Sequence, residues 1–171
     1  MIDNINKRTR DNVIAITLTS SNIQVVNNYQ PNSNLKTLDL ETPEILYVIL
    51  PYYNFSKSGR RKQLLMDFLN RYGNLTRIRF VIIEASDNQF ELPYNQKEVY
   101  LHLRYKIRHY FQIKENLMNV AISKLPNDWQ YVSWIDTDLT FLNPNWVEET
   151  ISELERSDFI QLFQTAVFYG T

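Results

Sequence analysis

The chain has 171 residues, enough for one domain with its own core, and its 44% hydrophobic and 22% charged residues are ordinary for a soluble globular protein. A net charge of −1 provides no positive field that would favour nucleic acid or an anionic membrane. Cysteine is absent, which excludes a disulfide scaffold, a zinc–thiolate site and a cysteine nucleophile. Because the chain also has only two histidines, a metal site would use mainly oxygen ligands, which suit Mg²⁺ or Mn²⁺.

Residues 1–43 differ from the rest of the chain. The segment 1–10 is polar and charged and has no apolar core of a signal peptide. Two short β-prone runs, 13–18 and 23–26, are separated by serines and an asparagine, which predicts a small hairpin. We expect residues 1–43 to form an N-terminal extension and residues 44–171 to form the main domain.

The main domain begins with a strand–helix–strand pattern. Residues 45–50 are a continuous apolar run, as in a strand buried on both faces, and Pro51 ends it. A helix follows Ser58, with Leu64, Leu65, Phe68 and Leu69 at helical spacing and a stop at Gly73. Residues 79–83 form a second buried strand that ends at Glu84. Such a unit predicts parallel pairing of its two strands.

The second half continues the alternation. Residues 99–103 predict an edge strand, and residues 106–124 predict a helix with a buried stripe at Ile113, Leu117, Val120 and Ala121. Residues 130–135 predict a strand that leads into two aspartates. Asn143 then caps a helix that has Pro144 at its first position, and residues 159–163 read as a last strand. This order predicts an α/β fold with a mostly parallel sheet.

Polar residues follow three of the predicted strands, at residues 51–54, 84–87 and 136–138. In open α/β sheets ligands bind beyond the carboxyl ends of the strands, so these segments should converge. Asp136 and Asp138 are two apart in an expected extended segment, which directs both carboxylates to one side. Such a pair can hold a divalent cation that also binds two phosphate oxygens. The alternative is a pair of turn or cap aspartates.

Residues 114–122, together with Trp134-Ile135-Asp136-Thr137-Asp138 and residues 143–146, resemble the donor-binding core of GT-A glycosyltransferases. The resemblance covers about residues 44–170 and is greatest to the family-2-like domains of large DNA viruses and some bacteria. It implies a GT-A (Rossmann-like) nucleotide-diphospho-sugar-binding domain that lacks part of the acceptor-binding half.

The resemblance also implies roles for individual residues. Pro51, Tyr52 and Asn54 would line a nucleoside pocket, with Tyr52 or Tyr53 offering an aromatic face to the base. Glu84, where the family usually has Asp, would accept a hydrogen bond from the base. Lys114 would meet the diphosphate. Within Asp136-Thr137-Asp138, which would contact the nucleotide sugar, Asp136 would reach the ribose or the metal and Asp138 the metal, Mn²⁺ or Mg²⁺.

Each of these residues also has a simpler interpretation. Glu84 could be a solvated carboxylate at a strand end, and Lys114 a surface lysine on an amphipathic helix. The basic cluster at residues 60–62 could approach phosphate, but a solvated basic turn is the favoured interpretation. The histidines and tryptophans read as structural residues: His102 and His109 as buried or exposed non-ligands, and Trp134 and Trp146 as core.

The combined prediction is a metal-dependent glycosyltransferase, or its donor-binding domain, that moves a sugar from a nucleotide-diphosphate donor to an acceptor hydroxyl, with a UDP-sugar as the expected donor. The resemblance places the catalytic base downstream, beyond Thr171. We expect a cytoplasmic protein without a transmembrane segment, in the host cell if the protein is viral. A non-catalytic interaction module stays open. So does a nucleotidyltransferase, although Gly59, Gly73 and Gly170 make no glycine-rich phosphate loop.

Overall fold

The computed structural model describes residues 23–25, 44–93, 96–109 and 113–168. Within these residues, five strands form one sheet in the order β1-β4-β3-β2-β5. Strands β2 to β5 are parallel, and β1 is antiparallel to β4. The strands are β1 (Ile23–Val25), β2 (Leu46–Tyr53), β3 (Ile78–Ser86), β4 (Val99–Ile107) and β5 (Tyr131–Trp134). The predicted α/β class with a mostly parallel sheet is confirmed, and the order of the parallel strands is compatible with a Rossmann-like fold.

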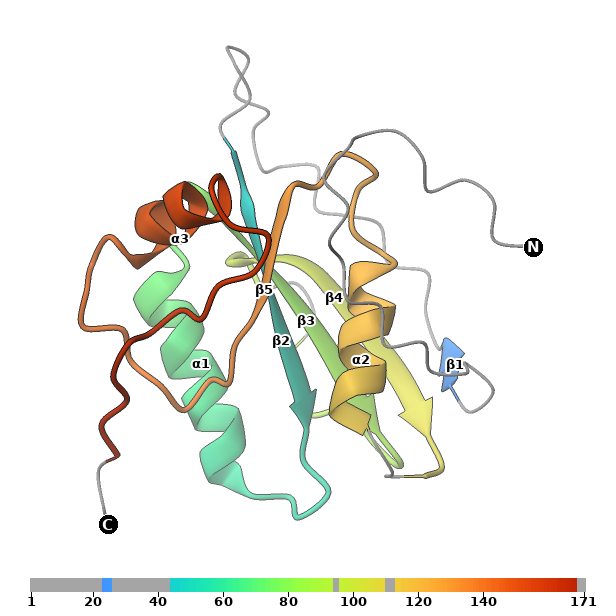
Figure 1. Ribbon diagram of the computed structural model, residues 1–171. Coiled ribbons are helices and arrows are strands. Elements are labelled where there is room, and N and C mark those ends of the chain that lie inside the picture. Colours follow the sequence, from blue (N-terminus) through green and yellow to red (C-terminus); the bar gives the residue numbers. More distant parts are fainter. Residues whose placement is uncertain (1–22, 26–43, 94–95, 110–112, 169–171) are drawn as a thin grey trace.

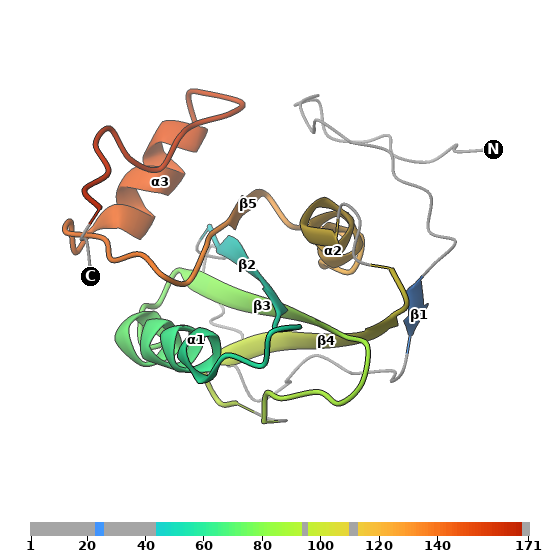
Figure 2. The same ribbon diagram turned by 90° about the horizontal axis from the view of Figure 1, so that it is seen from below.

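Three helices in the same residues cover both faces of the sheet: α1 (Gly59–Tyr72), α2 (Ile113–Ile122) and α3 (Trp146–Leu154). Figure 1 and Figure 2 show α1 and α2 on opposite faces. One core cluster joins α1 and α3 to alternate residues of β2, including Val48 and Leu50, whereas Ile49 belongs to the cluster under α2. Because both faces of β2 are covered, its sequence is a continuous apolar run, as predicted. The predicted end at Pro51 is wrong, because the strand continues through Pro51 to Tyr53 and stays paired with β3.

The order in which strands are added to the sheet reverses at β2. From β2 the chain adds β3 and then β4 in one direction, and it returns through α2 to place β5 on the other side of β2. The connections on the two sides of β2 therefore lead to opposite faces of the sheet. Crevices form where the strand order reverses in this way, beyond the carboxyl ends of the strands. The fold thus favours a ligand site between the ends of β2 and β5.

Helix α1 ends at the predicted glycine, but the reason is packing rather than a left-handed turn. Gly73 has φ −64°, a right-handed conformation open to any residue, and its N–H donates to the Leu69 carbonyl at 2.7 Å. A Cβ at this position would lie 2.5 Å from Glu98 Cγ and 2.6 Å from the Leu69 carbonyl oxygen. Gly73 is needed because the segment before β4 passes too close for a side chain.

Strand β4 and the segment after it differ from the prediction. The strand expected at 99–103 is confirmed, but β4 is not the edge strand of the described sheet, because β1 pairs with its outer side at residues 105–107. The alternation of buried and half-buried residues continues through Tyr105 and Ile107. The expected helix over 106–124 is therefore wrong for Lys106 and Ile107, which lie in β4, and for residues 123–124, which follow the helix. It is confirmed over Ile113–Ile122. Residues 110–112 lie outside the described part.

The N-terminal extension contributes to this sheet. Residues 23–25 pair with residues 105–107 of β4, so at least this piece of the extension belongs to the fold of the main domain. The run at 13–18, the other half of the expected hairpin, lies outside the described residues.

Two expectations near the C-terminal end are wrong. Helix α3 begins at Trp146 rather than Pro144, because Asn143 accepts a hydrogen bond from the Asn145 N–H at 2.9 Å and forms a turn before the helix. Residues 159–163 form no strand, since they join no ladder of the sheet and two phenylalanines among them are exposed. Throughout the described ranges, the helices are too short or too polar to cross a bilayer.

Candidate functional site

A cleft of about 280 Å³ opens at the carboxyl ends of β2 and β5, at the position that the strand order favours. It brings together residues from β2, the first two turns of α1, the first turn of α2, and the segment after β5. Its lining residues are Pro51, Tyr52, Tyr53, Arg61, Leu64, Lys114, Asp136, Thr137 and Asp138. Of the site residues predicted from the sequence, only Asn54 and Glu84 lie outside this lining.

The two aspartates lie in a turn that is anchored to β2. Strand β5 ends at Trp134, and the Ile135 N–H still donates to the Ile49 carbonyl at 3.2 Å. The expected extended segment at 136–138 is therefore wrong: the chain leaves the sheet after Ile135 and turns. Asp136 and Asp138 are both exposed in the cleft, so the turn still presents two carboxylates to the same space.

Lys114 holds the first of these carboxylates. Its Nζ lies 2.7 and 2.9 Å from the two carboxylate oxygens of Asp136. The lysine stands in the first turn of α2, whose Leu117 and Ala121 are buried against the sheet. Because the Asp136 side chain is 60% exposed, the pair contributes at most about 1 kcal/mol and can rearrange at low cost. Among the described residues no ion pair reaches Asp138.

Arg61 lines the cleft from α1, whereas the sequence considered it only as part of the basic cluster at residues 60–62. Its guanidinium donates to the Tyr53 carbonyl at 3.1 Å, and Cζ lies 5.6 Å from the centre of the Tyr53 ring. The solvated basic turn expected at residues 60–62 is confirmed for the two flanking residues, which are exposed and do not line the cleft. Arg61 could have been found by helical spacing, since it precedes Leu64 and Leu65 by three and four residues.

Tyr53 is the more accessible of the two tyrosines considered for a base. Its ring stacks on Phe55 with centroids 5.7 Å apart and also faces Arg61. Tyr52 is only 6% exposed, and its hydroxyl donates to Glu91 at 2.7 Å. Burial, followed by this hydrogen bond, raises the pKa of Tyr52 well above its usual value. Tyr52 thus acts mainly as a wall of the cleft that is fixed by the neighbouring loop.

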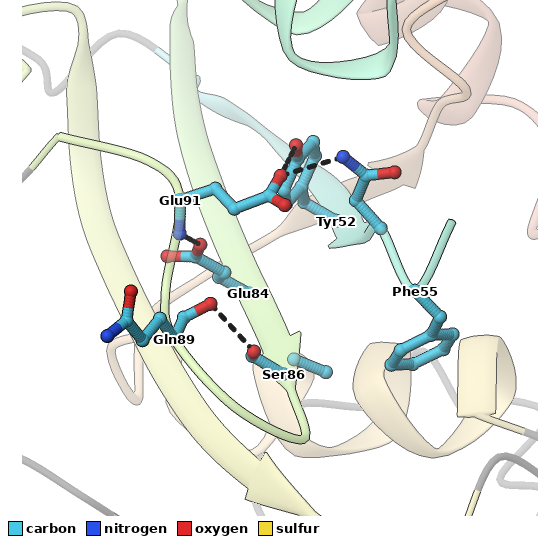
Figure 3. A pocket seen from close by; sticks show the side chains of 8 residues that line it. Tyr52, Phe55, Glu84, Ser86, Gln89 and Glu91 are labelled. Carbon is cyan, nitrogen blue, oxygen red and sulfur yellow. Dashed lines mark hydrogen bonds between the residues drawn. The ribbon is translucent and has the colours of Figure 1, made fainter. Parts of the chain in front are cut away.

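Glu84 lies outside the cleft, and its carboxylate is held by four donors from the protein, one of which is the Glu91 N–H (Figure 3). Its side chain is 1% exposed, so the solvated carboxylate considered from the sequence is wrong. Oε1 accepts from the backbone N–H groups of Glu91 and Leu92 at 2.6 and 3.0 Å. Oε2 lies 3.2 Å from His102 Nε2 and 3.1 Å from Arg104 Nε. A carboxylate offers about four acceptor positions, so a hydrogen bond from a nucleotide base would have to displace one of these partners.

These contacts keep Glu84 ionised. Burial acts to raise the pKa of its carboxyl, but the hydrogen bonds from His102 and from the backbone of Leu92 and Glu91 together hold the pKa below its usual value. The charge therefore anchors the loop that follows β3 to β4. His102 has the structural role expected of it, since it is 3% exposed and contacts Glu84.

A second network fixes the loop after β2. Glu91 Oε2 accepts hydrogen bonds from Tyr52 and from Asn54 Nδ2, each at 2.7 Å. The Asn54 side chain also bonds the backbone N–H and carbonyl of Ser58, at 2.9 and 3.0 Å. Asn54 therefore shapes the turn into α1. The pocket beside it has a volume of only about 10 Å³, enough for roughly one water molecule, and contains no ligand-sized space (Figure 3).

The cleft supplies two carboxylates for a metal ion. In the described ranges, no three histidine, aspartate or glutamate side chains gather in a group that could hold a metal by themselves. Mg²⁺ sites commonly use one or two carboxylates together with substrate phosphates and water, so Asp136 and Asp138 suit a cation that is shared with a ligand.

Trp134, expected in the core, is instead 45% exposed and touches Phe159, whereas Trp146 is 4% exposed in the core as expected. Trp134 lies on β5, an edge strand of the described sheet, where fewer neighbours can cover it.

Comparisons of this chain with protein-family models, with curated proteins and with solved structures found no match.

Proposed function

We propose that this chain is the donor-binding domain of a metal-dependent glycosyltransferase with a GT-A-like fold, and that the cleft binds a nucleoside-diphosphate sugar, with UDP the preferred nucleotide. The observation that carries the proposal is the placement of Asp136 and Asp138 beside Lys114 and Arg61 in one cleft, at the reversal of the strand order. Two carboxylates suit a cation, and two cationic side chains suit phosphate oxygens. The volume of about 280 Å³ is near the lower end for small-molecule sites.

Mn²⁺ or Mg²⁺ fits the donor set of the cleft. Asp138 is exposed and is the first candidate ligand, and Asp136 becomes the second when Lys114 moves from it. When bound, such a cation neutralises the charge that develops on a departing diphosphate. The residues of the chain itself orient the donor: Tyr52 and Tyr53 form a wall of the cleft, and the two cationic side chains attract the phosphates.

Two other functions compete with this one. A nucleotidyltransferase is disfavoured, because Asn54 and Ser58 bond each other in the turn between β2 and α1 where a glycine-rich phosphate loop would be needed. A binding module without turnover is the second candidate. It is favoured by the ion pair of Lys114 with Asp136, which competes with a metal ion for that carboxylate.

Calorimetric titration of UDP into the protein tests the proposal. We expect Mn²⁺ to increase the affinity for UDP at least about tenfold over the affinity with a chelator, a gain of ~1.4 kcal/mol or more. The gain would arise because Asp136 and Asp138 would hold the cation, and the cation would neutralise charge on the diphosphate. Binding of UDP that is indifferent to Mn²⁺ would favour the module without turnover, and no binding under either condition would reject the nucleotide site.

A further inference from the structure

The two cationic side chains of the cleft differ in what they contact. Lys114 Nζ lies 2.7 and 2.9 Å from both oxygens of Asp136, so the two charges neutralise each other. Arg61 contacts the carbonyl oxygen and the ring of Tyr53, neither of which carries a negative charge. In the part of the chain that the structure describes, no carboxylate lies within ion-pair distance of Arg61. Its positive charge is therefore the one in the cleft that is not compensated.

The contacts of Arg61 also fix its orientation. One hydrogen bond of 3.1 Å holds the guanidinium to the end of β2, and the Tyr53 ring supports it at 5.6 Å. A guanidinium has five N–H donors, so most of them stay available for a ligand. An arginine held in this way loses little conformational entropy when it binds an anion, and its planar fork matches two phosphate oxygens.

We propose that Arg61 is the main residue that recognises the diphosphate of the donor, while Lys114 serves as the counter-ion of Asp136 until a cation replaces it there. This inference rests on the proposed function and names the part of the ligand that Arg61 selects. A cation held by Asp138 and the guanidinium of Arg61 would then meet the diphosphate from different elements, the turn after β5 and the first turn of α1. The cleft should distinguish a nucleoside diphosphate from the uncharged nucleoside through Arg61 as well as through the cation.

The chain provides a matched control in the residue before it. Arg60 stands in the same turn of α1, is exposed, and does not line the cleft. Arg61→Ala and Arg60→Ala remove the same charge from nearly the same place. A long-range electrostatic effect would therefore act on both variants, whereas a direct contact with phosphate would act on Arg61→Ala alone.

The test is calorimetric titration of UDP and of uridine into the full chain and both variants, with Mn²⁺ present and at physiological salt. We expect Arg61→Ala to weaken UDP binding by about tenfold or more, the loss of a charge-assisted hydrogen bond, and to leave uridine binding within about twofold. Arg60→Ala should change UDP binding by less than about twofold. Arg61→Lys, which keeps the charge but loses the fork, should fall between Arg61→Ala and the original chain.

Several results would overturn the inference. Equal losses of UDP affinity in Arg61→Ala and Arg60→Ala would mean that the positive charge acts at long range and not through a direct contact with phosphate. Equal losses of UDP and uridine affinity in Arg61→Ala would mean that Arg61 acts by positioning Tyr53 and not by binding phosphate. If the unsubstituted chain binds UDP with Mn²⁺ and Arg61→Ala binds it equally well, only this inference fails. If the unsubstituted chain does not bind UDP at all, the proposed function fails with it.

Discussion

Replacing Glu84 with alanine is expected to lower the free energy of unfolding by about 3–5 kcal/mol, the usual cost of removing one partner from a buried ion pair. The substitution would leave Arg104 and His102 without their shared carboxylate, and two backbone N–H groups of the following loop without an acceptor. Domains of this size are typically stable by only about 5–15 kcal/mol, so much of the stability would be lost. Urea denaturation followed by circular dichroism measures the change.

Two further variants make the result specific. Glu153→Ala removes the same charge from an exposed position on α3 and should change stability by less than about 0.5 kcal/mol. Glu84→Gln keeps the shape and loses the charge, and it provides a measurement if Glu84→Ala does not fold. A cost below about 1 kcal/mol for both Glu84 variants would contradict the anchoring role of this carboxylate.

The same network predicts a dependence of stability on pH. The pKa of Glu84 in the folded protein lies below its usual value, so folding favours the ionised form. The stability that Glu84 contributes is complete above the ordinary glutamate pKa. It is lost as the pH falls from there through the lower pKa of the folded state. Glu84→Gln should therefore lose less stability on acidification than the unsubstituted chain does.

Replacing Asp138 with alanine is expected to abolish the gain in UDP affinity that Mn²⁺ provides, which we place at about tenfold or more. Asp138 is an exposed cleft carboxylate that no ion pair of the described residues neutralises, so a cation would meet it first. Affinity for UDP in the presence of a chelator should change little, because the remaining contacts to the nucleotide are intact. Calorimetry with Mn²⁺ and with a chelator measures both quantities.

Asp128→Ala is the matched control for this prediction. Asp128 is also exposed, but it precedes β5 and therefore lies at the opposite end of the strand from the cleft. The Mn²⁺-dependent gain should be kept in Asp128→Ala. If Asp138→Ala keeps it as well, the carboxylate pair does not hold the cation, and the proposed chemistry of the cleft is wrong.

The parts of the fold that the sequence predicts well are those whose pattern is local. Strands β2 and β3 are continuous apolar runs because both of their faces are covered, a pattern typical of the central strands of a parallel sheet. Strand β4 is longer than predicted. Its alternation of buried and half-buried residues continues to Ile107, but the charged residues Arg104 and Lys106 at the half-buried positions made this part resemble the start of a helix. The missing strand at 159–163 shows the opposite error: β-prone residues form no strand without a partner in the sheet.

The candidate site also contains residues that a local pattern predicts and contacts that it does not. Asp136 and Asp138 follow a predicted strand, and the strand order brings them to β2 as expected. The partners of Glu84 could not be predicted, because His102 and Arg104 lie 18 and 20 residues away and meet Glu84 only through the register of β3 and β4. Tertiary contacts of this kind leave no periodic signal in the sequence. Glu84 and Asn54 therefore resemble ligand residues in the sequence, although they bond within the protein.

The most direct test of the metal-dependent nucleotide site is a crystal structure of the chain grown with UDP and Mn²⁺, with anomalous data collected near the manganese absorption edge. We predict an anomalous peak in direct contact with the Asp138 carboxylate and with the diphosphate, and nucleotide density in the cleft between β2 and β5. Nucleotide bound elsewhere on the protein, or a manganese peak away from Asp138, would contradict the account.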